Sequence, residues 1–296
     1  MDIHDPLKTT GYQKIKITES RMSNNSKLVN SHYGANNLSE KIKTALIKAG
    51  KDTGNLSLED ISTFEDFHIG GKEATHKLAE LVDFTKDMKV LDIGSGLGGP
   101  SRTLAADYGC KVTGIDLTRE FVDAAKMLSS LTNLESKVNF IHGSGLEIPV
   151  EDGSFDLVWM QHVGMNIENK AALYKEIKRV LIKNGLAAFY EILKGNDNQI
   201  HFPVFWAEDK NLNFLITENE MKQALSDLDF KEIKREDATA YGISQLETRM
   251  EKNEDGLPPL TMSVIVEKDN FKKAKNVLLN LKEEKIKVVR LLFRSI

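Results

Sequence analysis

The chain has 296 residues, enough to bury the core of one large α/β domain or of two small ones. Its 40 basic and 44 acidic residues give a net charge of −4, which argues against a broad nucleic-acid-binding face. The single cysteine excludes an internal disulfide framework and a cysteine-rich zinc site. No apolar run approaches the roughly 20 residues of a membrane span, and the N-terminus lacks the apolar core of a signal peptide. We therefore expect a cytoplasmic protein without membrane insertion or a nucleic-acid partner.

The N-terminal part divides into a polar tail and a helical cap. Residues 1–30 are rich in Lys, Ser, Asn and Thr and show no apolar period, which predicts a flexible tail. Residues 31–85 carry two amphipathic patterns. One helix begins at Leu38 and stops at Gly50, and a second extends from Gly71 to Leu81.

Strand and helix patterns alternate over residues 86–192, and this predicts a doubly wound parallel sheet. A helix is expected from Pro100, another with an apolar face that includes Phe121 and Leu128, and a third that carries Leu173 to Leu181 inward and ends at Asn184-Gly185. The expected strands are Lys89–Ile93, Lys111–Asp116, Val138–His142, Phe155–Met160 and Leu186–Ile192.

The pattern is looser over residues 193–296, which we assign to a substrate-side loop and the C-terminal part of the same domain. The loop spans residues 194–216, and Thr217 with Glu220 forms the capping box of the next helix. The remaining expected elements are a strand over Phe230–Glu236, a helix over Phe271–Leu281 and a strand over Ile286–Phe293. The sequence thus predicts a single domain from residue 31 to residue 296.

A glycine run follows the first expected strand and precedes a helix, as in nucleotide-binding loops. Gly94, Gly96 and Gly99 fit the dinucleotide pattern, whereas Gly94, Gly96 and Gly98 fit a G-x-G-x-G pattern. Asp92 separates the two, because a carboxylate at ~6 Å from a pyrophosphate costs roughly 3 kcal/mol at a dielectric of ~20. The same carboxylate would attract the ammonium and sulfonium groups of S-adenosylmethionine, unless it only caps the loop.

Asp116 ends the second expected strand, 24 residues after Asp92. An acidic side chain at this place can accept hydrogen bonds from both hydroxyls of an adenosine ribose. A helix-capping role is the alternative, since Asp often precedes a helix. The spacing from the glycine loop favours the ribose.

With these residues in place, the chain resembles the class I S-adenosylmethionine-dependent methyltransferases, in their small-molecule branch of ubiquinone/menaquinone-type and sarcosine/dimethylglycine-type enzymes. The likeness is carried by VLDIGSGLGG, GIDLTREFVDAA, GSGLEIPVEDGSFDLVW and MNIENKAALYKEIKRVLIKNG. It implies a Rossmann-like sheet with a final antiparallel strand and an N-terminal helical lid. It also implies S-adenosylmethionine as cofactor and S-adenosylhomocysteine as product, held by Asp92, Gly94, Ser95, Gly96, Gly98, Asp116, Leu117, Ser144, Gly145, Leu146 and Gln161.

Two details of this resemblance concern the adenine and the methyl group. Ser144, Gly145 and Leu146 would lie near the adenine, although many relatives have an acidic residue where Ser144 stands. Gln161 and His162 would lie beside the methyl donor.

The candidate catalytic residues are His162 and His68. His162 follows the fourth strand at the carboxyl edge of the sheet, where ligands bind, and is a candidate base or orienting group. His68 precedes two glycines and the lid helix. Ordinary structural roles remain open for both: a hydrogen-bonded histidine at a strand end and a solvated histidine in a loop.

Aromatic residues are the candidates for binding the acceptor: Tyr33, Phe202, Phe205 and Trp206. Such rings attract an amine through cation–π contacts, or they simply pack beneath a long loop. His76, His142 and His201 have no metal-ligand spacing, so we expect no metal site.

The sequence therefore predicts methyl transfer to a small molecule, with an amine nitrogen preferred over oxygen or carbon. An NAD-dependent oxidoreductase and a non-catalytic nucleoside-binding protein are the alternatives. The oligomeric state is open between monomer and homodimer.

Overall fold

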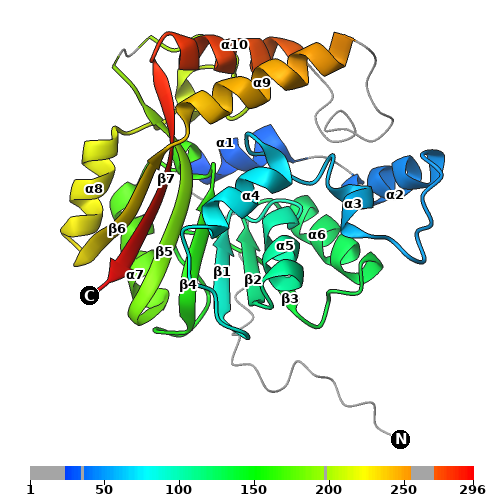
Figure 1. Cartoon of the computed structure of the whole chain (residues 1–296), viewed down its shortest axis with the longest axis horizontal. Coiled ribbons are helices and arrows are strands. Elements are labelled where there is room, and N and C mark those ends of the chain that lie inside the picture. The colour runs from blue at the N-terminus through cyan, green and yellow to red at the C-terminus, as the bar shows by residue number, and fades with distance from the viewer. Residues whose placement is uncertain (1–23, 35–36, 197–198, 255–269) are drawn as a thin grey trace, which may run out of the picture.

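The computed structural model describes residues 24–34, 37–196, 199–254 and 270–296. At its centre is a seven-stranded sheet of order β3-β2-β1-β4-β5-β7-β6 (Figure 1). The first five strands are parallel, and β7 is antiparallel to both of its neighbours, β5 and β6. This confirms the doubly wound sheet with a final antiparallel strand. The strands are β1 (Lys89–Ile93), β2 (Lys111–Asp116), β3 (Val138–His142), β4 (Phe155–Gln161), β5 (Leu181–Lys194), β6 (Phe230–Asp237) and β7 (Ile286–Ser295).

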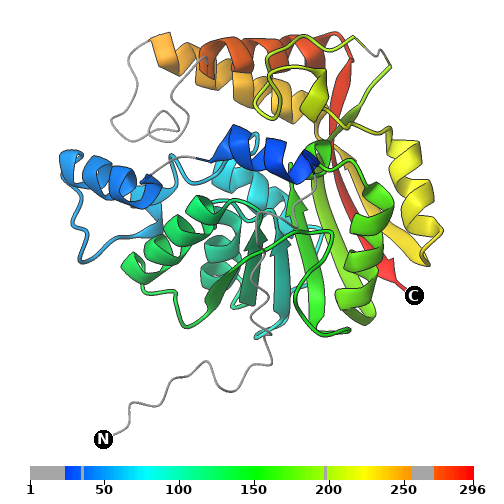
Figure 2. The same ribbon diagram turned by 180° about the vertical axis from the view of Figure 1, so that it is seen from behind.

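Helices cover both faces of the sheet (Figures 1 and 2). On one face pack α4 (Gly71–Ala79), α5 (Gly99–Asp107) and α6 (Arg119–Leu131), and α9 (Thr239–Glu254) and α10 (Asn270–Lys282) join the same apolar cluster from the top of the sheet (Figure 1). The other face is covered by α7 (Lys170–Val180) and α8 (Glu218–Ser226). Because both faces are covered, the central strands are apolar almost throughout, and six of the seven residues of β4 are buried.

The junction of α7 and β5 differs from the sequence prediction. The helix ends at Val180, and Leu181 already pairs with Phe155 as the first residue of β5. Asn184, which has a φ of 63°, and Gly185 therefore lie within β5, where the pairing with β4 shifts register. An Asn-Gly pair that commonly ends a helix here forms an irregularity in a strand, because Asn184 tolerates positive φ and a Cβ at Gly185 would approach the carbonyl oxygen of Ile182 to 2.9 Å.

The N-terminal part is more ordered than its composition indicated. Residues 24–30, assigned to the flexible tail, form most of α1 (Asn24–Tyr33), whereas the rest of that tail lies outside the described residues. Tertiary contacts explain the difference: Val29 packs on the core, and Tyr33 donates a hydrogen bond to Asn166 at 3.0 Å. α2 (Leu38–Lys48) and α3 (Leu58–Ile61) pack beside α6 through an apolar cluster that is separate from those on the two faces of the sheet.

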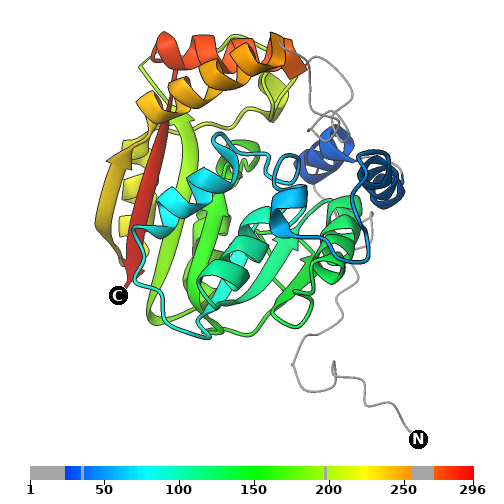
Figure 3. The same ribbon diagram turned by 45° about the vertical axis from the view of Figure 1, so that its right-hand side comes forward.

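The carboxyl ends of the parallel strands face a group of helices from both ends of the chain. In Figures 1 and 3, α9 and α10 lie across the top of the sheet and α1 lies beside them. Two short 3₁₀ helices, η3 (Gly164–Asn166) and η4 (Lys210–Leu212), belong to the loops on this edge. Ligands of open α/β sheets bind at this edge, so the arrangement fixes where a site is to be sought.

Candidate active site

A cavity of about 450 Å³ lies at this carboxyl edge. Its size is within the usual range of small-molecule sites. It brings together fifteen of the residues singled out from the sequence: Tyr33, His68, Asp92, Gly94, Ser95, Gly96, Asp116, Leu117, Ser144, Gly145, Leu146, Gln161, His162, Phe205 and Trp206. The complete lining extends from Asn25 to Val277, so segments more than 200 residues apart along the chain meet in one place.

Two of the expected site residues do not line the cavity. Gly98 has a φ of 83° and is the N-cap residue before α5, and a side chain there would collide with Phe140 and Arg102. Its role is to allow the turn into the helix. Phe202 packs against the apolar core instead, which was the alternative considered for each aromatic residue.

The glycine turn is shaped by close contacts on both sides. Gly94 and Gly96 have φ values of 71° and 52°, and a Cβ at Gly94 would collide with Val163. The amide of Gly96 donates to the carboxylate of Asp116 at 2.9 Å, so the turn is tied to the end of β2. The backbone is therefore held open toward the cavity by residues that allow positive φ.

Asp92 is 2% exposed and lines the cavity below this turn. Its Oδ2 accepts a hydrogen bond from the Ser101 hydroxyl at 2.6 Å. Burial raises the pKa of the Asp92 carboxyl to about 7, against the opposing effect of that hydrogen bond. A buried carboxyl with one donor is suited to a cationic ligand group, which would favour its charged form.

Asp116 is organised in a similar way. Its Oδ1 accepts from the amide of Thr118 at 2.8 Å and its Oδ2 from the amide of Gly96. Burial raises the pKa of this carboxyl, and the two amides act in the opposite direction. Each carboxylate oxygen has a further lone pair, which leaves acceptor capacity toward the cavity.

A hydrogen-bond network that sequence analysis did not find fixes the orientation of Gln161 and His68. The indole nitrogen of Trp159, which can only donate, contacts Gln161 Oε1 at 2.7 Å. Thr75 Oγ1 must then donate to the same oxygen, at 3.1 Å, and is left to accept from His68 Nε2 at 3.4 Å. His68 Nε2 also faces Asp66 Oδ1 at 3.6 Å, so this nitrogen carries the proton.

The consequence is that Nδ1 of His68 keeps a free lone pair. This buried atom has no hydrogen-bond partner among the described residues. Thr75 and Trp159 give no signal in the sequence, because they lie on α4 and β4 and meet only in the fold.

The neutral ring of His162 has the opposite pattern of hydrogen-bond donor and acceptor, because here Nδ1 is already occupied. Its Nδ1 accepts a hydrogen bond from the amide of Ile69 at 3.2 Å, so in the neutral ring the proton is on Nε2. The ring stacks on Tyr190, with 4.6 Å between centroids. Burial, reinforced by the charge of Arg290, lowers the pKa of His162 well below its usual value. His162 is therefore a neutral hydrogen-bond donor, and its Nε2 has no partner within the described chain.

The other walls of the cavity come from residues that sequence analysis did not propose for the site. They include Asn25, Ser26 and Val29 of α1, Met165 and Asn166 of η3, Ile192 of β5 and Val277 of α10. Asn166 joins several of them, since it accepts from Tyr33 and donates to the carbonyl oxygens of Trp206 and Leu212.

The charges around the cavity have one sign. Within the described part of the chain its lining contains Glu65, Asp92, Asp116 and Glu168 but neither Lys nor Arg. Glu65 is paired with the buried guanidinium of Arg102, and Glu168 is exposed. An anionic ligand would thus find no cation in this lining.

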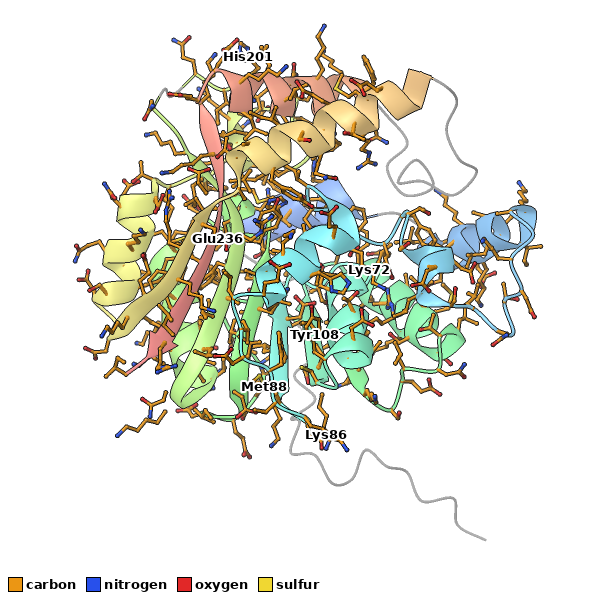
Figure 4. All side chains as sticks on the ribbon, in the orientation of Figure 1. Lys72, Lys86, Met88, Tyr108, His201 and Glu236 are labelled. Carbon is orange, nitrogen blue, oxygen red and sulfur yellow. The ribbon has the colours of Figure 1, made fainter. Side chains whose placement is uncertain are left out.

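The histidines outside the cavity do not form a metal site in the described ranges, where no three His, Cys, Asp or Glu side chains gather suitably. His76 contacts Tyr108, whereas His201 contacts Glu283 and Lys285. Tyr108 and His201 lie in separate parts of the molecule (Figure 4).

Comparison with known proteins agrees with this geometry. A family model described as a methyltransferase domain matches residues 91–189. Sarcosine/dimethylglycine N-methyltransferase of Halorhodospira halochloris is 30% identical over 190 residues, which cover 59% of this chain and 67% of that enzyme. Sterol 24-C-methyltransferase ERG6B of Gibberella zeae is 34% identical over 118 residues, covering 40% of this chain and 31% of that one.

A solved structure with a similar fold is geranyl diphosphate C-methyltransferase from Streptomyces coelicolor A3(2), in complex with Mg2+, geranyl-S-thiolodiphosphate and S-adenosyl-L-homocysteine. Its TM-score is 0.66 at 13% identity, with coverage of 93% of this chain and 99% of that one. At this identity the likeness concerns the fold alone.

A doubly wound sheet with a glycine turn after its first strand and carboxylates beside that turn defines a nucleoside-binding α/β fold. The chain belongs to the class I S-adenosylmethionine-dependent methyltransferases of the small-molecule branch. It spans about one third and two thirds of the length of the two curated relatives above. None of its described helices has the length and apolarity required to span a membrane.

Proposed function

We propose that this protein transfers the methyl group of S-adenosylmethionine to a small-molecule acceptor. One observation carries the proposal: the buried carboxyl group of Asp92 and the half-buried carboxyl group of Asp116 flank the glycine turn in a cavity whose described lining has no cationic side chain. This arrangement suits a positively charged nucleoside without phosphate, and it disfavours the pyrophosphate of NAD.

The residues present fit such a cofactor, which supplies, when bound, an electrophilic methyl group on a cationic sulfur. Asp92 would hold the ammonium group, and Asp116 would accept from the ribose hydroxyls. Ser144, Gly145 and Leu146, on a short turn where the Leu146 amide donates to Ser144 Oγ at 3.1 Å, would contact the adenine. Alignment of the acceptor in a water-poor cavity is the main contribution expected of the protein.

His68 is the better candidate for the base if the acceptor must lose a proton. Its Nδ1 has a free lone pair, whereas the corresponding lone pair of His162 is already used by the Ile69 amide. His162 would instead donate a hydrogen bond from Nε2. Assigning the base to His68 therefore follows from the tautomers that the neighbouring donors impose.

The acceptor atom is less directly indicated. An amine nitrogen suits the aromatic residues Tyr33, Phe205 and Trp206, which line the cavity, and one relative is a sarcosine/dimethylglycine N-methyltransferase. The sterol 24-C-methyltransferase relative supports a carbon acceptor. A small-molecule acceptor is compatible with both of these relatives.

Isothermal titration calorimetry tests the proposal with three ligands: S-adenosylmethionine, S-adenosylhomocysteine and NAD. We expect the first two to bind with micromolar or lower Kd and NAD to show no binding at 1 mM. Binding of NAD without binding of S-adenosylmethionine would overturn the assignment. Methylated product from an acceptor panel would then exclude a purely nucleoside-binding role.

A further inference from the structure

The part of the cavity away from the glycine turn is largely apolar. Four of its side chains come from four different elements: Val29 of α1, Met165 of η3, Ile192 of β5 and Val277 of α10. Ile69, Phe205 and Trp206 add further apolar surface. Burial of hydrocarbon against such a wall contributes roughly 25 cal/mol per Å², so an acceptor with substantial apolar area is favoured here.

Formal charge on the acceptor is disfavoured in both signs. A carboxylate or phosphate would leave water without meeting a cation in the described lining. An ammonium group of the acceptor would find little free negative charge: Glu65 is paired with Arg102, Glu168 is exposed, and Asp92 and Asp116 lie beside the glycine turn, where the proposed function assigns them to the cofactor. The lining thus selects a neutral molecule.

Three buried nitrogens without partners occur on residues that line the cavity: His68 Nδ1, Gln161 Nε2 and His162 Nε2. The contacts described above determine whether each nitrogen donates or accepts a hydrogen bond. His68 Nδ1 is an acceptor, whereas Gln161 Nε2 and His162 Nε2 are donors. Groups so placed cost free energy if they stay unpaired, which indicates that a ligand satisfies them.

We propose that the methyl acceptor is an uncharged, hydrophobic molecule that presents one hydroxyl group to these three nitrogens. A hydroxyl donates one hydrogen bond and accepts two, which matches one acceptor and two donors. An amine nitrogen offers a single lone pair, and a carbon acceptor offers none. This inference rests on the proposed function and narrows its acceptor to an alcohol or phenol.

In the resulting reaction the hydroxyl proton passes to Nδ1 of His68 while an oxygen electron pair forms the new O–C bond. The electron pair of the broken S–C bond stays on sulfur, which leaves as a neutral thioether. Gln161 and His162 stabilise the negative charge that develops on the oxygen through hydrogen bonds. His68 then releases the proton to solvent, so atoms and charges balance.

The test uses four compounds titrated into the full-length protein. S-adenosylhomocysteine is titrated first, and its failure to bind would defeat the proposed function itself. The protein loaded with it is then titrated with 4-butylphenol, 4-butylbenzoate and 4-butylbenzylamine, which share one scaffold and differ in charge. We expect 4-butylphenol to bind at least tenfold more tightly than either charged compound.

If either charged compound binds as tightly as 4-butylphenol, or if 4-butylphenol does not bind, the inference is wrong while the cofactor assignment stands.

A variant adds an independent test of the electrostatic argument. Met165→Arg places a cation in the apolar wall and should reverse the order of 4-butylphenol and 4-butylbenzoate. Met165→Leu is the matched control and should preserve the order of the unsubstituted protein.

Discussion

At the scale of single residues, the carboxylate of Asp116 shapes the end of the cavity beside the glycine turn. It accepts the amides of Gly96 and Thr118 and so joins the glycine turn to the start of α6. Asp156 offers a matched comparison, because its carboxylate also accepts a backbone amide, that of Lys89 at 2.7 Å, but does so outside the cavity.

Asp116→Asn should weaken S-adenosylmethionine binding about tenfold to a hundredfold, because a neutral amide forms weaker hydrogen bonds and one of its two polar atoms cannot accept. Calorimetry measures this change. Asp156→Asn should leave the affinity within twofold. Equal effects of the two substitutions would show that Asp116 acts only through the fold.

Asp92 predicts a pH dependence of cofactor binding. Its pKa is about 7 in the free protein because of burial, and the negative charges of Asp116 and Asp66 also act to raise it. A cationic ligand favours the charged carboxylate and lowers this pKa. Below pH 7 the carboxyl must first lose a proton, so affinity should fall by up to tenfold per pH unit, whereas above pH 8 it should be constant.

Calorimetry between pH 5.5 and 8.5 measures this dependence. In the Asp92→Asn variant, the change of affinity with pH that comes from this group should vanish, and the overall affinity should be lower. An affinity of the unsubstituted protein that does not change between pH 8 and pH 6 would contradict the role given to Asp92.

At the scale of elements, β6 is the exposed edge of the sheet, and ion pairs hold it in place. Of its eight residues only Phe230 is buried. Glu218, at the start of α8, contacts Arg235 of β6 at 3.0 Å, Lys222 at 2.7 Å and Lys287 of β7 at 2.8 Å. These contacts, the largest being the hydrogen bond from Arg235, hold the pKa of Glu218 well below its usual value.

A folded-state pKa below the unfolded value of about 4.3 contributes stability that is present above that value and is lost as pH falls below it. Glu218→Gln should therefore lower the free energy of unfolding by about 1–3 kcal/mol at pH 7 and by less at pH 3. Urea unfolding at both pH values measures this. Exposed Glu135, substituted by Gln, is the control and should change stability by less than about 0.5 kcal/mol; a similar loss in both variants would refute the role of the cluster.

At the scale of the whole molecule, the cavity joins elements from both ends of the chain. α1 and α10 contribute to it together with the loops after β1, β2 and β4. Any ligand that fills it binds the folded state and not the unfolded chain, so it stabilises the entire fold.

S-adenosylhomocysteine at 100 times its Kd should add about 2.7 kcal/mol of stability and raise Tm by roughly 5 °C. Differential scanning calorimetry measures the shift, and NAD at the same concentration should give none. A rise that is as large with NAD would mean that the cavity does not discriminate against pyrophosphate.

The sequence by itself determined the central sheet and the glycine turn. Lys89–Ile93, Lys111–Asp116 and Val138–His142 are strands with the predicted bounds. These features depend on local apolar runs and on residues that allow positive φ. Both signals come from neighbouring positions in the sequence, so they can be recognised without the tertiary structure. The same holds for the capping box of Thr217 and Glu220.

Only the tertiary structure decided the rest of the site. It moved Gly98 and Phe202 out of the cavity lining and ordered residues 24–30 into α1. It also placed Thr75 and Trp159 where they fix the tautomer of His68. The walls and proton positions of the cavity depend on contacts between side chains far apart in the chain, and packing, rather than local periodicity, brings those side chains together.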